Sequence, residues 1–162
     1  MGKRVEAVIM KKFIILGVFF YFAYAKNYVG YCPLEPDTAL TFWAIQKYKD
    51  KDAKFFLGDK KSVINLKKAM KINTSDAKIK RNGRFTAFEI FLYKNNIKSN
   101  KCIKKLIKMD KVLEMMPWMK NQFPDILAFE NKLRNLSPKN RGKVKLKRLF
   151  HYIDNFCMKN DK

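Results

Sequence analysis

The sequence predicts an α+β fold, a helix-rich single domain with a small β-sheet. Several segments carry apolar residues three and four positions apart, which is the period of a helix packed on a core. Short apolar runs that end at glycine or proline are typical of buried strands. The chain has 162 residues, 48% of them hydrophobic, which suits one compact domain.

The first 25 residues stand apart from this domain. Lys11 and Lys12 precede the apolar run FIILGVFFYF, and the small residues Ala23 and Ala25 follow it. A basic start, an apolar centre and an A-x-A site are the parts of a secretory signal peptide. We therefore expect cleavage after Ala25 and a domain of residues 26–162 that is exported, either periplasmic or secreted.

Two questions stay open at this end of the chain. A start at Met10 would give a complete shorter signal, so translation begins at either Met1 or Met10. An uncleaved N-terminal membrane anchor is the alternative to export, although the apolar run is shorter than the about 20 residues of a membrane-spanning helix.

In the first half of the domain the expected order is strand, helix, strand, helix. Residues 26–35 form an extended lead-in that suits an edge strand. A helix then begins after Pro36 with Asp37 as its N-cap. Its inward face carries Leu40, Trp43, Ala44, Lys47 and Tyr48.

The next two elements are read from the segment 55–71. Residues 55–57 form a short buried strand that Gly58 closes. Residues 60–71 form a helix with Val63, Leu66 and Met70 facing inward and lysines facing outward.

The second half predicts helices throughout. Asn82-Gly83 favours a tight turn, because both residues accept positive φ. Thr86 and Glu89 form a capping box, which starts a helix that buries Phe88, Phe91 and Leu92. Further helices span residues 100–116, which Pro117 ends, and residues 124–136; a last one has apolar residues at helical spacing from Leu146 to Cys157.

Motifs for common chemistry are missing from the sequence. There is no phosphate-binding glycine loop, no nucleophile elbow and no zinc-protease motif, so we predict no catalytic residue and no cofactor. His151 is the only histidine, and Cys32, Cys102 and Cys157 show no C-x-x-C spacing, so we predict no metal site. One cysteine pair is expected to bridge in an oxidising compartment, with the pairing left open, and Cys157 is expected to be buried.

The domain is strongly basic. The chain carries a formal charge of +22, and residues 1–25 hold four basic residues and one acidic residue, so their removal leaves +19. The partners open to such an exported protein are small oxyanions and an anionic membrane surface. Nucleic acid is not expected, because the lysines are scattered without an aromatic repeat. A solvated surface is the simplest interpretation of most of them.

One cluster of cations has a local context that suits an anion. Lys78, Lys80, Arg81 and Arg84 surround the predicted turn just before the capped helix at Thr86. Positive side chains beside free backbone amides at a helix N-terminus stabilise a bound anion. A solvated basic turn is the alternative.

Two blocks of residues match the pattern of a known family. The first holds Asp37, Trp43, Ile45, Lys47, Tyr48, Asp50, Ala53 and Phe55, and the second holds Gly83, Arg84, Phe88 and Glu89. With these residues the sequence resembles the chromate resistance family, found as exported proteins and as the C-terminal half of ChrB chromate-responsive proteins. The resemblance covers about residues 33–115.

The resemblance implies an exported protein that binds chromate or a related oxyanion under metal or oxyanion stress. The implied site takes its charge from Lys47, Arg81 and Arg84, with Trp43 in its wall, while Asp37, Asp50, Phe88 and Glu89 complete the motif. Lys80 and Arg81 stand where family members commonly have His, and Thr86 where many have Cys. We therefore expect anion binding rather than a redox or metal role.

Two further function classes remain beside this one. A non-enzymatic basic envelope protein would bind anionic lipid or an acidic partner through its charged surface. An enzyme such as a reductase is less favoured, because the sequence lacks the cofactor motif or reactive thiol that reduction normally needs.

Overall fold

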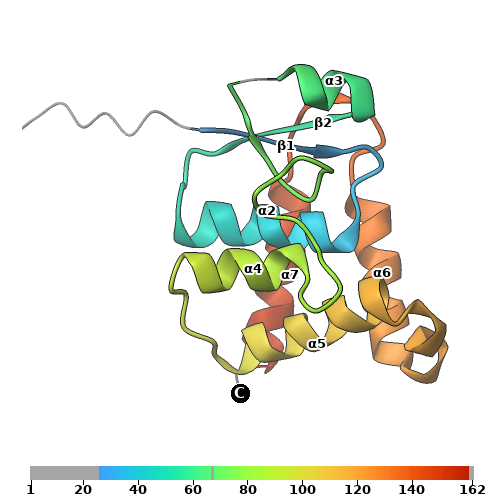
Figure 1. The fold of residues 1–162 in the computed structure, drawn as a ribbon. Coiled ribbons are helices and arrows are strands. Elements are labelled where there is room, and N and C mark those ends of the chain that lie inside the picture. Colours follow the sequence, from blue (N-terminus) through green and yellow to red (C-terminus); the bar gives the residue numbers. More distant parts are fainter. Residues whose placement is uncertain (1–25, 67, 161–162) are drawn as a thin grey trace, which may run out of the picture.

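The computed structural model describes residues 26–66 and 68–160, and it confirms the predicted α+β domain with a small sheet (Figure 1). The predicted signal peptide, residues 1–25, lies outside the described part. In chain order the elements are β1 (Asn27–Tyr31), α2 (Pro36–Tyr48), β2 (Lys54–Gly58), α3 (Lys60–Asn65), β3 (Met70–Lys71), α4 (Ala87–Lys94), α5 (Lys101–Met115), a 3₁₀ helix (Pro117–Gln122), α6 (Pro124–Leu136), β4 (Gly142–Val144) and α7 (Lys147–Asn160). Within these ranges no helix is both long enough and apolar enough to cross a membrane.

The sheet has the strand order β3-β1-β2-β4. β1 runs parallel to both β2 and β3, and β4 is antiparallel to β2. The prediction of an edge strand in residues 26–35 is therefore wrong, because β1 pairs on both sides and Tyr28 and Val29 are completely buried. Sequence analysis missed β4, since Gly142-Lys143-Val144 offers one apolar residue and no alternation.

The central helix of the fold is α2. It lies between the sheet and α4, with α3 on the opposite face of the sheet (Figure 1). Every residue of α2 from Pro36 to Ile45 is buried, so the helix has no solvent face over its first ten positions. A helix that is apolar on most sides belongs in an interior, so the single inward face predicted for these positions was too narrow. The prediction was wrong at the end of the helix, where Lys47 and Tyr48 are exposed.

Aromatic contacts tie α2 to the elements above and below. The ring of Phe42 lies 4.7 Å from that of Phe55 on β2, and Phe55 lies 5.5 Å from Phe150 on α7. Trp43 packs 6.4 Å from Phe88 on α4. The interior is thus continuous from the sheet to the C-terminal helix, and aromatic pairs of this kind add to the free energy gained by burial.

The predicted helix of residues 60–71 is too long. α3 ends at Asn65, and Val63 is its buried residue, as predicted. Leu66 and Met70, both expected to face inward, are exposed at 41% and 38%. Met70 belongs instead to β3, where pairing with Tyr28 overrides the helical spacing of the sequence.

The C-terminal half follows the predictions closely. The Thr86–Glu89 capping box starts α4, which buries Phe88, Phe91 and Leu92. α5, α6 and α7 lie where helical spacing placed them, and Cys157 is buried as predicted. A disulfide joins Cys102 on α5 to Cys157 on α7, and Cys32 is the free cysteine.

Candidate functional site

Lys47, the first predicted anion-binding residue, lies in the last turn of α2. Its ammonium group forms an ion pair with Asp154 on α7, and the same carboxylate accepts a hydrogen bond of 3.1 Å from Trp43 Nε1. The Lys47 ammonium also sits 5.1 Å from the centre of the Trp43 ring. Lys47 and Trp43 therefore share one carboxylate that fastens α2 to α7, and Trp43 is a core residue at 1% exposure.

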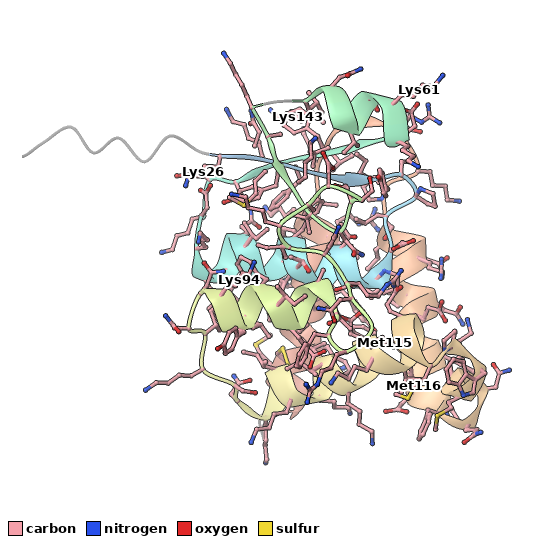
Figure 2. All side chains as sticks on the ribbon, viewed as in Figure 1. Lys26, Lys61, Lys94, Met115, Met116 and Lys143 are labelled. Carbon is pink, nitrogen blue, oxygen red and sulfur yellow. A yellow bond between two sulfur atoms is a disulfide. The ribbon has the colours of Figure 1, made fainter. Side chains whose placement is uncertain are left out.

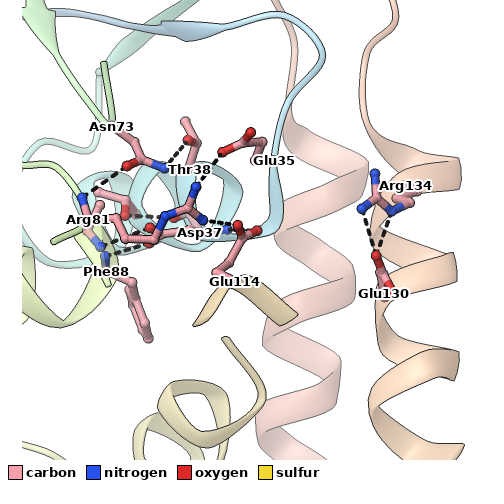
Figure 3. A network of polar contacts seen from close by, with 11 residues as sticks. Glu35, Asp37, Thr38, Asn73, Arg81, Phe88, Glu114, Glu130 and Arg134 are labelled. Atoms are coloured by element: carbon pink, nitrogen blue, oxygen red, sulfur yellow. Dashed lines mark hydrogen bonds and ion pairs between the residues drawn. The ribbon is translucent and has the colours of Figure 1, made fainter. Parts of the chain in front are cut away.

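Arg81, the second predicted residue, binds carboxylates of the protein itself (Figure 3). Its guanidinium pairs with Glu114 on α5 and lies 3.8 Å from Glu35. Its backbone N–H donates to Asn73 Oδ1 at 3.0 Å. Burial alone would lower the pKa of Arg81, but the carboxylates of Glu114 and Glu35 raise it above its ordinary value. The charge of Arg81 is thus already compensated.

Arg84, the third predicted residue, is exposed on the loop before α4. Its guanidinium carbon lies 5.6 Å from the centre of the Phe85 ring. The chain bends here, as predicted, without a positive φ at Asn82 or Gly83. The Asn82 side chain closes the turn instead, because its Oδ1 accepts hydrogen bonds from the N–H groups of Arg84 and Phe85 at 2.9 and 2.8 Å.

These three cations do not come together. Arg81 contacts Glu35 at the start of α2, whereas Lys47 lies in the last turn of that helix. A helix of 13 residues is about 20 Å long. The expectation of one oxyanion site built from Lys47, Arg81 and Arg84 is therefore wrong, because Lys47 and Arg81 lie near opposite ends of α2.

Asp37 occupies the helix N-terminus that was predicted to bind an anion. Its carboxylate accepts hydrogen bonds from the backbone N–H groups of Ala87 at 2.9 Å and Phe88 at 2.8 Å, in the first turn of α4 (Figure 3). Asp37 lies inside α2, whose N-cap is Glu35, so the prediction that Asp37 caps its own helix is wrong. The protein supplies its own anion at α4, and the amides there are no longer free for a ligand.

A second carboxyl group, Asp110 on α5, faces this cap. It is completely buried, and neither of its oxygens makes a hydrogen bond, although the side chains of Asp37 and Thr86 lie beside it. Burial raises the pKa of Asp110 well above its ordinary value, and the neighbouring Asp37 raises it further. Burial also raises the pKa of Asp37, while its two amide hydrogen bonds oppose that rise.

The other residues of the family pattern have structural contacts. Asp50 accepts a hydrogen bond of 2.9 Å from the backbone N–H of Lys26, which closes the start of β1 onto the loop after α2. Glu89 completes the capping box and pairs with Lys111 at 3.0 Å. Phe88 is completely buried. These residue types are thus explained by the fold, without a ligand.

The described part of the protein contains a different concentration of positive charge, which we call the basic cavity. It encloses about 850 Å³ between the start of β1, the edge strand β3, the segment 76–79 and the end of α4. Six lysines line it: Lys26, Lys49, Lys68, Lys71, Lys78 and Lys94. Figure 2 shows Lys26 and Lys94 on the left of the molecule and Lys61 at its upper right.

The lysines of the basic cavity are poorly balanced by acid. Asp76 is the one carboxylate in its lining, and it pairs with Lys71. Lys94 Nζ donates to the backbone carbonyl of Lys78 at 3.0 Å, and Lys49 Nζ donates to the side chain of Asn95. A neutral acceptor leaves the full charge of the ammonium group in place, and each ammonium has three donors. The cavity therefore keeps both charge and donors for an anion.

Sequence analysis missed most of this cavity. Lys78 belonged to the predicted basic cluster, but the remaining five lysines were assigned to a solvated surface, since they come from separate segments of the chain. The two Arg residues of that cluster do not line the cavity. The signal available in the sequence was the lysine excess itself, and the tertiary fold brings β1, β3 and the ends of α2 and α4 together around the cavity.

Among the described residues no group of three or more His, Cys, Asp and Glu side chains is arranged to hold a metal ion. Comparison with known proteins gave no match to a family model, to a curated protein or to a solved structure.

Proposed function

We propose that this is an exported anion-binding protein and that the basic cavity is its binding site. The observation that carries the proposal is the lining of six lysines against one carboxylate. Chromate and sulfate are the small oxyanions that the family resemblance implies. The site differs from the one first expected, since Arg81 and Lys47 are held by carboxylates of the protein.

Electrostatics favours an occupant of negative charge. Ammonium groups that gather over a cavity repel one another, and walls of low dielectric constant focus their field into the enclosed space. A bound anion lowers this repulsion and accepts hydrogen bonds from several lysines at once. Such charge-assisted hydrogen bonds are about twice as strong as neutral ones.

The size of the cavity bears on the ligand. A volume of about 850 Å³ falls within the usual range of small-molecule sites, about 300–1,000 Å³. One tetrahedral oxyanion would fill only part of it. Chromate, sulfate and phosphate are therefore suitable probes of the charge, while the natural ligand has an anionic group attached to a larger body.

Two features support export. The segment of residues 1–25 has the composition of a signal peptide. The disulfide between Cys102 and Cys157 suits the oxidising compartments to which exported proteins go, because cytosolic thiols are normally kept reduced.

The test is equilibrium binding of chromate, sulfate and phosphate to the purified protein, measured by calorimetry at two salt concentrations. The cavity variant combines Lys26→Gln with Lys49→Gln, which removes two charges from the lining. The matched control combines Lys61→Gln with Lys143→Gln, two exposed lysines that do not line the cavity. Both variants lower the net charge equally.

We expect saturable binding of at least one oxyanion, weakened about tenfold in the cavity variant because two nearby charges are lost. The control should bind within about twofold of the unmodified protein, since charges that are exposed and lie outside the lining are screened by solvent and salt. Equal losses in the two variants would show that the protein attracts anions through net charge alone, and that the cavity is not a site.

A further inference from the structure

We propose that the ligand is a single-chain anionic amphiphile, with its head among the lysines of the basic cavity and its acyl chain in an adjoining apolar groove. This inference rests on the proposed anion-binding function and names the class of ligand. It begins from a second hollow, which encloses about 870 Å³ along α4 and α5 and which we call the apolar groove.

Apolar side chains dominate the lining of this groove. They include Phe85, Ile90, Tyr93, Ile97, Ile103 and Ile107. Tyr93 is 85% exposed and Phe85 is 41% exposed, so large apolar surfaces border the groove and face water. Contiguous exposed apolar surface of this kind marks a place where an apolar group is bound.

The groove and the basic cavity are neighbours. Ala77, Lys78 and Lys94 line both. The hydrogen bond from Lys94 Nζ to the Lys78 carbonyl, 3.0 Å long, joins the end of α4 to the segment 77–80 and forms the ridge between them. A molecule with its charged end in the cavity therefore has apolar surface available directly beyond this ridge.

Charge along the groove is uneven, and this selects the occupant. The lysines in its lining are Lys78, Lys80 and Lys94, and two of them, Lys78 and Lys94, also line the cavity. At the opposite end of α4, Glu89 is already paired with Lys111. Lys111 and Arg84 lie there over the Phe85 ring, 5.7 and 5.6 Å from its centre. A lysine cluster at the shared end and an apolar course beyond it match a ligand with an anionic head and an apolar tail.

The length of the groove suits an acyl chain. α4 has eight residues and is therefore about 12 Å long. A chain beside it gains affinity with each methylene that leaves water, up to about fourfold per group when burial is complete. Rising ionic strength weakens binding through the head, because it screens the charges, but does not weaken binding through the chain.

The experiment compares three probes: inorganic phosphate, dodecyl phosphate and dodecyl maltoside. The two amphiphiles are used below their critical micelle concentrations. They present the head alone, the head with a chain, and the chain with a neutral head. The groove variant combines Tyr93→Ser with Ile90→Gln. The matched control is Trp118→Ser, since Trp118 is another exposed aromatic, at 73%, and does not line the groove. Circular dichroism checks that each variant is folded, and Ile107→Trp, which fills the groove, replaces the groove variant if that one unfolds.

We expect dodecyl phosphate to bind at least about a hundredfold more tightly than phosphate. The groove variant should bind dodecyl phosphate about tenfold more weakly and phosphate with unchanged affinity. Trp118→Ser should change neither affinity. The cavity variant, Lys26→Gln with Lys49→Gln, should weaken the binding of both phosphate and dodecyl phosphate but not the binding of dodecyl maltoside.

Three results would overturn the inference. If dodecyl phosphate binds no better than phosphate while the cavity variant weakens both, the anion site stands and the groove has no part in it. If dodecyl maltoside binds as well as dodecyl phosphate, the head contributes nothing. If binding occurs only to vesicles of anionic phospholipid and not to monomeric dodecyl phosphate, the protein recognises a membrane surface.

A separate result would count against the proposed function itself. That function fails if the cavity variant changes the affinity for neither phosphate nor dodecyl phosphate.

Discussion

Asp37→Ala is expected to destabilise the fold through a helix that lies 50 residues further along the chain. The Asp37 carboxylate caps α4 by accepting the N–H groups of Ala87 and Phe88 at 2.9 and 2.8 Å. Alanine leaves both donors buried and without a partner, while it suits α2 itself, since it is the best helix former. The change therefore isolates the contact between α2 and α4.

The magnitude follows from the two hydrogen bonds. Hydrogen bonds to a charged group contribute about 1.5–3 kcal/mol each, so their loss amounts to about 3–6 kcal/mol. Removing the carboxylate also ends the unfavourable burial of charge beside Asp110, which offsets part of the loss. We expect a net decrease of about 3 kcal/mol in the free energy of unfolding.

Urea unfolding followed by circular dichroism measures this decrease. With a slope of about 2 kcal/mol per molar urea, the midpoint should fall by about 1.5 M. The control is Asp125→Ala, an exposed aspartate in the first turn of α6, for which a loss of about 0.5 kcal/mol is expected from the helix dipole. A loss below about 1 kcal/mol for Asp37→Ala, or equal losses in the two variants, would refute this account of the α4 cap.

Three further predictions concern the interior of the protein. Burial raises the pKa of Asp110 above its value in the unfolded chain. The contribution of this carboxyl group to stability is therefore complete below about pH 4 and is lost as the pH rises through the folded pKa. In urea titrations, Asp110→Asn should gain stability over the unmodified protein between pH 4 and pH 7. Reduction of the disulfide between α5 and α7, whose cysteines are 55 residues apart, should lower the free energy of unfolding by up to about 4 kcal/mol, seen as a lower Tm in dithiothreitol. Gly30→Ala should cost about 1–3 kcal/mol in urea unfolding, because a Cβ there would lie 2.7 Å from Thr38 Cγ2.

Each of these predictions has an outcome that contradicts it. A stability difference for Asp110→Asn that does not change with pH would mean that this carboxyl titrates normally. An unchanged Tm in dithiothreitol at full reduction would leave the bridge without a role in stability. Gly83→Ala is the control for Gly30→Ala, since the space around Gly83 is open, and equal losses at the two glycines would exclude crowding as the cause.

Local signals predicted the helices of the C-terminal half well. The capping box of Thr86 and Glu89, and Pro124 at the start of α6, act within one turn of chain. Helical spacing of apolar residues likewise needs only a stretch of ten or so positions. These features are decided by neighbours in sequence, so one sequence is enough to read them.

Elements that depend on distant partners were read less well. Residues 26–35 were predicted to hold an edge strand, yet β2 and β3 pair on both sides of β1. Met70 has the spacing of a helix but pairs with Tyr28 in the sheet. In both cases hydrogen bonds to another segment outweigh the local pattern, and no local pattern records which segment that is.

The sequence by itself determined the α+β class, the basic character and most helix positions, because these follow from composition and from spacing over a few residues. Only the tertiary structure decided which charges are compensated. It brings Asp37 to the amides of α4, Glu114 to Arg81 and Asp154 to Lys47, and it leaves six lysines from separate segments around one cavity. The physical reason is that electrostatic interactions depend on distance in space, and folding alone sets the distance between residues far apart in the chain.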